Sequence, residues 1–368
     1  MKMKKYYFAL ILFVFPLTLF ARTSDLDSFR ARPPIHIFGP QAQLPQGITP
    51  DKIKIAYHLP KDGGKGTIAI IDAFDSPMIE HDLGVFDKTF SLVDCTLKNK
   101  CLEVHKMSSK VKTDSGWAGE TALDVEWAHA VAPHAKILLI EALTDSGTNL
   151  LKAVDYARNR SDVVAVSMSW GGGEFSGEDK LDTHFMAKSG VTFFASSGDN
   201  GAGVSWPAVS SKVVAVGGTT LVFKADGTVS RELGWDGSGG GVSAYIPEPA
   251  YQKDYKIPRD KNMRGIPDVS YNADPATGFS VYLSNSTGRG AWQIVGGTSA
   301  GAPQWAAIRA LGSGVSNEIF YADKAKTNNK GFFRDITSGS NGDCTYFCDA
   351  RAHYDYVTGL GSPQTSVF

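Results

Sequence analysis

The sequence predicts an α/β protein: a single domain with a parallel central sheet and helices on both of its faces. Two observations predict this class. Short runs rich in Val, Ile, Leu and Ala are near-continuous, as in strands that are buried on both faces. These runs alternate along the chain with segments of helical spacing. The predicted strands are residues 67–74, 135–142, 162–170, 191–197 and 213–218.

Helical patterns lie between these strands, at about residues 119–131, 147–159 and 179–189. A last helix opens at Ser299 and runs through APQWAAIRAL. Glycine-rich stretches such as residues 234–241 are predicted loops. Loops at the carboxyl ends of parallel strands are where sites form, so the glycine-rich loops are candidates to line a cleft.

The first residues have the layout of a secretory signal peptide. Lysines precede an apolar run from about Tyr6 to Phe20, and Ala21 comes before the first polar residues. The alternative is a membrane anchor, but the run is shorter than the roughly 20 residues that a bilayer requires. We therefore expect residues 1–21 to be removed and the protein to be secreted or periplasmic, with no membrane attachment afterwards. Residues 22–47, rich in proline and polar groups, are predicted to be an extended lead-in or short pro-segment.

Composition and cysteine count further restrict the class of protein and the kind of cysteine site. A hydrophobic content of 42% allows a sizeable core, and a net charge of −1 argues against a nucleic-acid binder. The four cysteines fall into two close pairs, Cys95 with Cys101 and Cys344 with Cys348. In an exported protein such pairs favour local disulfides. The alternative is a zinc site, but the usual C-x₂-C spacing is absent.

The helical segment at residues 119–131 carries two acids on one apolar face. Glu120 and Asp124 are i,i+4 neighbours on the face that also holds Leu123, Trp127 and Val131. If that face is buried, the two carboxyl groups should share a proton, and one pKa should be raised. The alternative is that both acids lie at the edge of the apolar face and are exposed to solvent. His129 falls on the outer side and is expected to be solvated rather than to act as a base.

Two further stretches place polar side chains next to glycines. In GGTSAGAP, Ser299 lies at the N-terminal end of the last helix, where its hydroxyl could attack a carbonyl carbon. In SSGDNG, Asp199 follows a predicted strand. Asp-Asn-Gly also suits a simple turn, so an active-site loop and a turn are both open interpretations of this segment.

Together, GGTSAGAP, ETALD and SSGDNG resemble the sedolisins, the serine-carboxyl peptidases with a subtilisin-like fold. Agreement extends over RGIPDVSYNADPATG, RDITSGSNG and DYVTGLGSP, so the resemblance covers about residues 48–363. It implies that Ser299 is the nucleophile, Glu120 the general base and Asp124 the group that orients Glu120. It also implies that protonated Asp199 donates a hydrogen bond to the oxyanion. Asp72 and Trp170 are either extensions of this network or structural residues.

The resemblance also implies one structural Ca²⁺ ion near the C-terminus. Its ligands would be the carboxylates of Asp335 and Asp355 and the carbonyls of Ile336, Arg351 and His353. Relatives usually have glycine where this chain has Arg351 and His353, and a glycine that needs a positive φ is not replaced cheaply.

The implied function is that of a monomeric, acid-active endopeptidase that cleaves proteins or peptides. Two alternatives stay open: release of short peptides from free amino termini, and a binding protein on a peptidase scaffold without catalysis. Sedolisins typically carry a large N-terminal pro-segment, whereas only the lead-in stands between the signal peptide and the peptidase domain here. The lead-in is expected either to perform a smaller version of that task or to have no such role.

Overall fold

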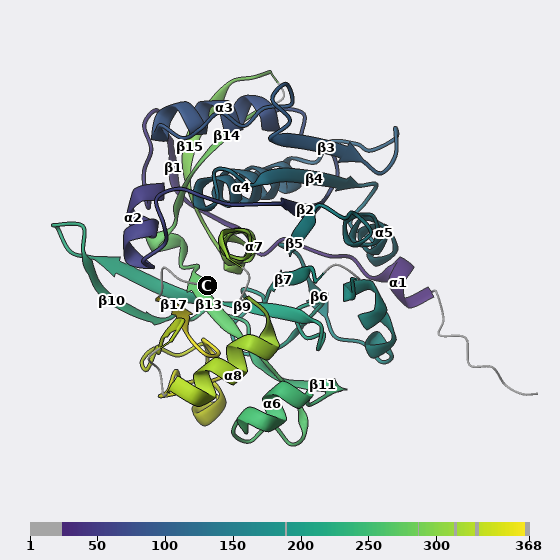
Figure 1. Cartoon of the computed structure of the whole chain (residues 1–368), viewed down its shortest axis with the longest axis vertical. Helices are drawn as coiled ribbons and strands as arrows, with labels where there is room; N and C mark the ends of the chain where they lie inside the picture. Colours follow the sequence, from purple (N-terminus) through teal and green to yellow (C-terminus); the bar gives the residue numbers. More distant parts are fainter. Residues whose placement is uncertain (1–23, 188–189, 286, 313–314, 328–330, 365–368) are drawn as a thin grey trace, which may run out of the picture.

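The computed structural model describes residues 24–187, 190–285, 287–312, 315–327 and 331–364. A mostly parallel sheet forms its centre (Figure 1). The strands of this sheet are β2 (Thr67–Ala73), β3 (Leu102–Lys106), β4 (Lys136–Ala142), β5 (Val163–Met168), β7 (Thr192–Ser196), β9 (Val213–Phe223), β10 (Val229–Gly234) and β13 (Val269–Asn272).

The strand order is β10-β9-β7-β5-β2-β4-β3, and β13 also pairs with β9. Every pair is parallel except β10 with β9, which is antiparallel. Because consecutive parallel strands point the same way, the segments that follow β2, β5 and β7 all emerge at one edge of the sheet. Each of the five predicted strands is present, with ends that differ by a few residues.

Helices cover both faces of the sheet, as the fold class predicts (Figure 1). One hydrophobic core lies between the sheet and α3 (Ile79–Phe90), α4 (Ser115–Val131) and α7 (Gly301–Leu311). The second core lies on the opposite face, under α5 (Gly147–Arg158). Strand β2 serves both: Ile68 and Ile70 face the first core, while Ala69 and Ile71 face the second.

Smaller elements surround these layers. The remaining helices are α1 (Ser24–Ser28), α2 (Pro50–Ala56), α6 (Ala250–Tyr255) and α8 (Asn317–Thr327), with 3₁₀ turns η1 (Glu178–Phe185), η2 (Pro275–Thr277), η3 (Thr298–Ala300) and η4 (Thr345–Phe347). The remaining strands are β1 (His36–Ala42), β6 (Gly172–Gly173), β8 (Ser205–Trp206), β11 (Gly241–Pro247), β12 (Met263–Ile266), β14 (Phe279–Ser284), β15 (Gly290–Gly296), β16 (Phe333–Arg334) and β17 (Ser362–Pro363).

The lead-in is more structured than its composition suggests. It begins with α1, crosses the sheet edge, and ends as β1, which pairs antiparallel with β15. In Figure 1 it runs as a purple strip from α1 across the molecule to β1. The predicted signal peptide, residues 1–21, lies outside the described residues.

One segment predicted to be an α-helix has a different secondary structure. The segment predicted as a helix over 179–189 forms the 3₁₀ turn η1 instead. It contains Asp179, Asp182 and Thr183, and short polar side chains of this kind compete with the backbone for hydrogen bonds in a helix interior. The Glu178 carboxylate, for example, accepts a hydrogen bond from the Phe175 N–H at 2.9 Å.

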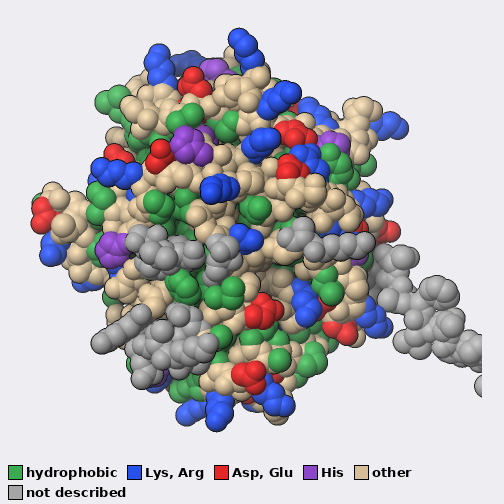
Figure 2. Space-filling view, in the orientation of Figure 1, with side chains coloured by type: hydrophobic (Ala, Val, Ile, Leu, Met, Phe, Trp, Pro, Cys, Tyr) green, Lys and Arg blue, Asp and Glu red, His purple; other side chains and the backbone are tan. Residues whose placement is uncertain are grey.

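Two surface properties bear on partners. Lysines, arginines and acids are interspersed on the face shown in Figure 2, without one continuous basic area. In the part of the chain that is described, no helix combines the length and apolar character needed to cross a bilayer.

Candidate active site

Helix α4 carries Glu120 and Asp124 into the interior. Asp114 caps the helix, its side chain accepting from the N–H groups of Gly116 and Trp117 at 3.0 and 3.1 Å. Both acids have no exposed surface. Burial raises the pKa of Glu120 and of Asp124 well above their ordinary values, and the charge of Asp72 raises both further. The interpretation of a solvated helix edge is therefore wrong.

Helix α4 is in fact buried on nearly all sides, because β14 and α3 cover the side that faces away from the sheet. His129, expected to be solvated, is completely buried. Its Nε2 lies 2.8 Å from the Val93 carbonyl oxygen and 3.4 Å from Asp87 Oδ1. Burial lowers the pKa of His129 to about 4, so the ring is neutral near pH 7. It lies among core groups and is not part of the Glu120 cluster.

Ser299 approaches these acids from another segment. It lies in η3, immediately before α7, and its side chain is buried. Contact with the Ser299 hydroxyl lowers the pKa of Glu120, partly offsetting the effect of burial. Helix α7 packs closely on the sheet here: a Cβ atom on Gly301 would lie 2.5 Å from Val216 Cγ1. Only glycine allows this approach, which brings Ser299 to the end of α4.

Ser169 was not singled out from the sequence, yet it joins the two segments. Directly after β5, its Oγ lies 2.8 Å from Asp124 Oδ1 and 3.3 Å from the Ser299 carbonyl oxygen. This hydroxyl lowers the pKa of Asp124, against the larger effect of burial. Such a contact fixes the orientation of the Asp124 carboxyl group relative to Ser299.

Asp199 completes the group from the loop after β7. Its Oδ1 accepts hydrogen bonds from the Thr298 N–H at 2.8 Å and from the Thr298 Oγ1 at 2.7 Å. Its Oδ2 lies 3.1 Å from Nε2 of His36, in the lead-in. Burial raises the pKa of Asp199, while His36 and Thr298 lower it. Thr298 thus ties the Asp199 loop to the segment that carries Ser299, and the simple-turn interpretation is incomplete.

Asp72 and Trp170 have different surroundings. Asp72, at the end of β2, is fully buried, and burial raises its pKa to about 7. Its charge raises the pKa of Glu120 and Asp124, so it belongs to the same acidic cluster. Trp170 Nε1 donates to the Ile71 carbonyl oxygen at 2.8 Å, a bond that ties the ends of neighbouring strands together. Its contacts are structural.

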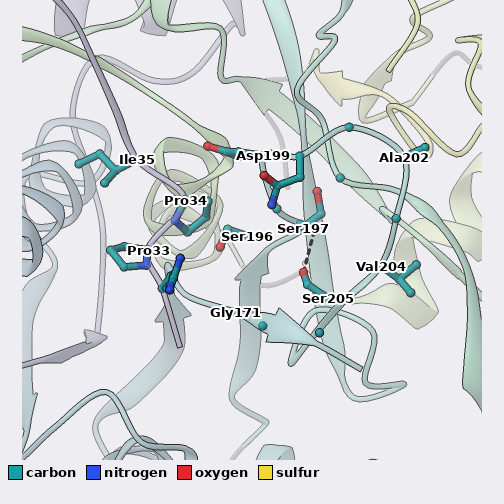
Figure 3. A pocket seen from close by; sticks show the side chains of 18 of the residues that line it. Pro33, Pro34, Ile35, Gly171, Ser196, Ser197, Asp199, Ala202, Val204 and Ser205 are labelled. Carbon is teal, nitrogen blue, oxygen red and sulfur yellow. Dashed lines mark hydrogen bonds between the residues drawn. The ribbon is translucent and has the colours of Figure 1, made fainter. Parts of the chain in front are cut away.

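A cleft of about 540 Å³ lies beside Asp199 (Figure 3). Glycines and serines from residues 171–173, 196–205 and 239 make up half of its lining, and Arg30, Arg32 and His36 of the lead-in also line it. The lead-in forms one side of it, with Pro33, Pro34 and Ile35 passing next to Asp199. Gly239 approaches the floor so closely that a Cβ atom there would clash with the Ser197 carbonyl oxygen. One of the glycine-rich loops predicted to line a cleft therefore does so.

The C-terminal region holds the two aspartates that the sequence analysis expects to bind Ca²⁺, Asp335 and Asp355. Asp355 is buried, and its carboxylate accepts from the N–H groups of Arg351, Val357 and Thr358 at 2.8–3.0 Å. No Lys or Arg of the described chain forms an ion pair with it, so its negative charge is unmatched. Asp335 binds the same loop, its carboxylate accepting from the His353 N–H at 2.9 Å.

The carbonyl oxygens of Ile336, Arg351 and His353 accept no hydrogen bond from any described residue. Carboxylate and carbonyl oxygens are the ligand types that Ca²⁺ prefers, so the chemistry of these groups fits that ion. His353 has a φ of 70°, in the left-handed region that histidine enters more readily than most residues. Arg351 has a negative φ, so neither replacement of glycine prevents this backbone from forming.

Both cysteine pairs form disulfides, with Cα–Cα distances of 4.9 Å for Cys95–Cys101 and 5.2 Å for Cys344–Cys348. His129 lies near the first bridge. Sulfur atoms in a disulfide are not thiolate ligands, so the disulfide interpretation holds and the zinc alternative does not.

Comparisons with known proteins show the family and the fold. The profile of the Subtilase family matches residues 114–321. The chain is 35% identical to kumamolisin from Bacillus sp. over 371 residues, 88% of this chain and 63% of the relative. It is 29% identical to sedolisin from Pseudomonas sp. and 31% identical to tripeptidyl-peptidase 1 from Dictyostelium discoideum. These two alignments cover 80% and 67% of this chain, and 56% and 46% of the relatives, so the chain spans about half to two thirds of their length.

The structure is similar to Pseudomonas sedolisin, a serine-carboxyl proteinase, in complex with pseudo-iodotyrostatin. The TM-score is 0.70 at 26% identity, over 88% of this chain and 96% of the other. Sphericase, at 20% identity and a TM-score of 0.56, shares the fold.

Proposed function

The chain belongs to the sedolisin-type serine-carboxyl peptidases of the subtilase family, and on that premise we propose that it is an exported, acid-active endopeptidase. The observation that carries the proposal is the meeting of Glu120, Asp124, Asp199 and Ser299, from three segments, at one edge of the sheet. An exported peptidase also agrees with the predicted signal peptide and the two disulfides.

Ser299 Oγ attacks the carbonyl carbon of the substrate peptide bond. Glu120 takes the hydroxyl proton and later gives it to the leaving amine, the part that histidine plays in other serine peptidases. Asp124, held by Ser169, orients Glu120 and shares its proton. Water then repeats the sequence on the acyl-enzyme and frees Ser299.

Asp199 stabilises the negative charge that forms on the carbonyl oxygen. Its Oδ1 is held by Thr298, which leaves Oδ2 as the oxygen that can carry a proton and donate. Such a donor contributes about 2.7–4 kcal/mol to transition-state stabilisation. The donor form disappears as pH rises through the pKa of Asp199, while the base form of the Glu120 cluster disappears as pH falls. The rate should therefore be bell-shaped in pH, with its maximum in acid.

Tripeptidyl-peptidases among the relatives raise the alternative of exopeptidase action. The cleft argues for endopeptidase action, because the lead-in lines it over a long stretch, at Arg30 and at residues 32–36. A site that ends after a tripeptide would not hold so long a segment. Parallel assays on peptides with free and blocked amino termini separate the two activities: equal cleavage supports the endopeptidase.

We also propose that Asp335, Asp355 and the carbonyls of Ile336, Arg351 and His353 hold one structural Ca²⁺. The ion would neutralise the buried charge of Asp355 and tie the loop of Arg351 to the segment of Asp335. It would lie in a separate region from Ser299, so its role is stability rather than catalysis.

The decisive experiment measures kcat and KM on a quenched peptide between about pH 3 and pH 7, for the wild type and for Ser299→Ala. We expect the variant to lose roughly a millionfold in kcat, the scale seen when a serine nucleophile is removed. Activity that survives this change, or a rate that is highest at alkaline pH, would defeat the mechanism. A covalent adduct between Ser299 and a peptide aldehyde would separately exclude a non-catalytic binding protein.

A further inference from the structure

Three neighbouring strands carry ionisable residues side by side at their carboxyl ends. Asp72 of β2 is the register partner of Glu141 of β4, and Glu141 is also the partner of Lys106 of β3. Side chains alternate between the faces of a strand, and the residues two and four positions before each of the three pack in the core under α4. Asp72, Glu141 and Lys106 therefore form one row, the strand-end row, on the face that α4 covers. Glu120 and Asp124, the α4 pair, lie on that helix.

The strand-end row runs from the interior to the surface. Asp72 has no exposed area, Glu141 is 1% exposed, and the Lys106 side chain is 45% exposed. Lys106 Nζ lies 2.7 Å from Asp75 Oδ1 and 3.8 Å from Glu141 Oε2. The outer end of the row therefore carries a positive charge, and its inner end meets the α4 pair, whose pKa values the charge of Asp72 raises.

Few hydrogen bonds stabilise negative charge within the row. Glu141 Oε1 accepts from the Ser76 N–H at 2.9 Å. Within the described chain, Glu141 Oε2 and both oxygens of Asp72 meet no partner at hydrogen-bond geometry. Neighbouring buried carboxylates that lack donors do not readily ionise together, because each charge disfavours the next. Charged and protonated carboxyl groups should therefore alternate from Glu141 through Asp72 to the α4 pair.

The groups that face Glu141 decide where this alternation begins. They are Lys106 from β3, Asp75 and the Ser76 N–H from the segment after β2, and Asp72 from β2 itself. Burial raises the pKa of Glu141 to about 7, while Ser76 and Lys106 act in the opposite direction. Burial also raises the pKa of Asp72 to about 7, and the charge of Glu141 adds to this effect. No Lys or Arg of the described residues pairs with Asp72, so the nearby cation favours charge on Glu141 over charge on Asp72.

We propose that Glu141 and Lys106 are positioning residues for the reaction: ionised Glu141, paired with Lys106, keeps Asp72 protonated. The next negative charge then forms on the α4 pair, where it serves as the base. The inference rests on the proposed peptidase function and extends its machinery to β3 and β4. Neither residue lines the cleft beside Asp199, so both act through Asp72.

The sign follows from the order in which these acids lose their protons. In the wild type, Glu141 ionises before Asp72, and Asp72 stays neutral beside that charge. Without a charge at position 141, Asp72 ionises first, and its charge adds to burial in raising the pKa of Glu120 and of Asp124. The base form of the α4 pair then appears only at higher pH, so the acid limb of the pH–rate profile moves upward.

Glu141→Gln in the full chain tests the proposal, because glutamine keeps an acceptor for the Ser76 N–H and removes only the charge. We expect the acid limb of kcat/KM to move up by about one pH unit, the scale of a close charge interaction. Lys106→Met should move the limb in the same direction by less, since solvent screens this half-exposed cation. Asp87→Asn is the matched control: Asp87 is buried and burial raises its pKa to about 7, but it lies on α3, outside the row. It should leave the limb in place.

A second background separates this role from a purely structural one. Asparagine at position 72 cannot ionise, so adding Glu141→Gln to Asp72→Asn should leave the acid limb where Asp72→Asn alone places it. An equal shift in both backgrounds would show that Glu141 does not act through Asp72. An unshifted limb in the single variant Glu141→Gln would overturn the proposal outright.

A further readout does not depend on activity. In the Ser299→Ala background with ¹³C-carboxyl-labelled aspartate, NMR follows the titration of Asp72, whose signal is identified by its loss in Asp72→Asn. Adding Glu141→Gln should lower the midpoint of this titration by about one pH unit. An unchanged midpoint contradicts the inference. If no form of the enzyme shows Ser299-dependent cleavage, the proposed function fails, and the NMR titration still decides whether Glu141 controls the proton on Asp72.

Discussion

Two groups of completely buried acids in this molecule have opposite surroundings. Asp268, just before β13, forms a two-bond ion pair with Arg264 at 2.6 and 2.7 Å, and accepts from Tyr321 and from the Ala215 N–H at 2.8 Å. Both carboxylate oxygens of Asp268 therefore have hydrogen-bond partners. Burial alone would lower the pKa of Arg264, but Asp268 raises it well above its ordinary value.

Glu120 and Asp124 are buried to the same extent but have no such cation. Neither oxygen of Glu120 and only one oxygen of Asp124 meets a hydrogen-bond partner within geometric limits among the described residues. A buried acid with a matched cation stays charged and holds structure, whereas buried acids without one keep a proton that they can move. The environment, rather than the residue type or its burial, separates a structural carboxylate from a catalytic one.

The largest expected effect comes from removing the proton acceptor. Glu120→Gln should lower kcat by roughly 10⁴-fold or more. The members of a catalytic triad act together, so the loss of one removes most of the contribution of all of them. The melting temperature should stay level or rise, because an amide carries no buried charge.

Glu126→Gln is the matched control, since Glu126 lies on the same helix, is fully buried, and has a pKa raised by burial. Its carboxylate accepts from the Tyr282 N–H, a bond that glutamine preserves. It should keep near wild-type kcat. An equal loss in both variants would show that α4 needs buried acids for its structure.

Breaking the ion pair should give the reverse result, a loss of stability without a change in chemistry. Arg264→Met leaves Asp268 buried without its cation and should cost about 3–5 kcal/mol in the free energy of unfolding. Denaturant titration measures this loss, and active-site titration gives kcat for each folded molecule, which should not change. Arg264→Met with Asp268→Asn should recover part of the loss. A single variant as stable as wild type would mean that the pair is not the structural counterpart of the catalytic acids.

Asp199 allows a sharper test of the proton in its side chain. Asp199→Asn supplies an N–H donor at every pH, so the decline in rate above the acid optimum should weaken. The reason is that the wild-type decline follows ionisation of Asp199, whose pKa is raised by burial. Asp199→Ala removes the donor and should cost about 10²–10³-fold in kcat. An unchanged alkaline limb in Asp199→Asn would assign that limb to another group.

The sequence predicted the sheet, and it singled out the four candidate site residues that the fold brings together, because their signals are local. Strand β2 reads as a continuous apolar run, and GGTSAGAP, ETALD and SSGDNG are each contiguous. Ser169 and His36 carry no such signal. Their importance comes from contacts with Asp124 and Asp199, which only the fold brings near.

His129 shows the limit of helical periodicity. The pattern correctly placed Glu120 and Asp124 on a buried face, but it assumed that the opposite face met water. Strand β14 and helix α3 cover that face, and the sequence of α4 alone contains no information about them. The lead-in was underestimated for the same reason, since its proline-rich composition hides the pairing of Arg32 with Gly171.

Asp355 lies between the two extremes, as a buried acid whose cation would come from solution. Excess Ca²⁺ should raise the melting temperature relative to protein treated with a chelator, because a ligand at 100 times its Kd adds about 2.7 kcal/mol to the stability of the folded state. Asp335→Asn should abolish the response, whereas Asp349→Asn should retain it, since that half-buried acid pairs with the Arg351 side chain. If Ca²⁺ leaves the wild-type melting temperature unchanged, Asp355 is stabilised by its amide donors alone, and a buried carboxylate can remain without either a cation or a catalytic task.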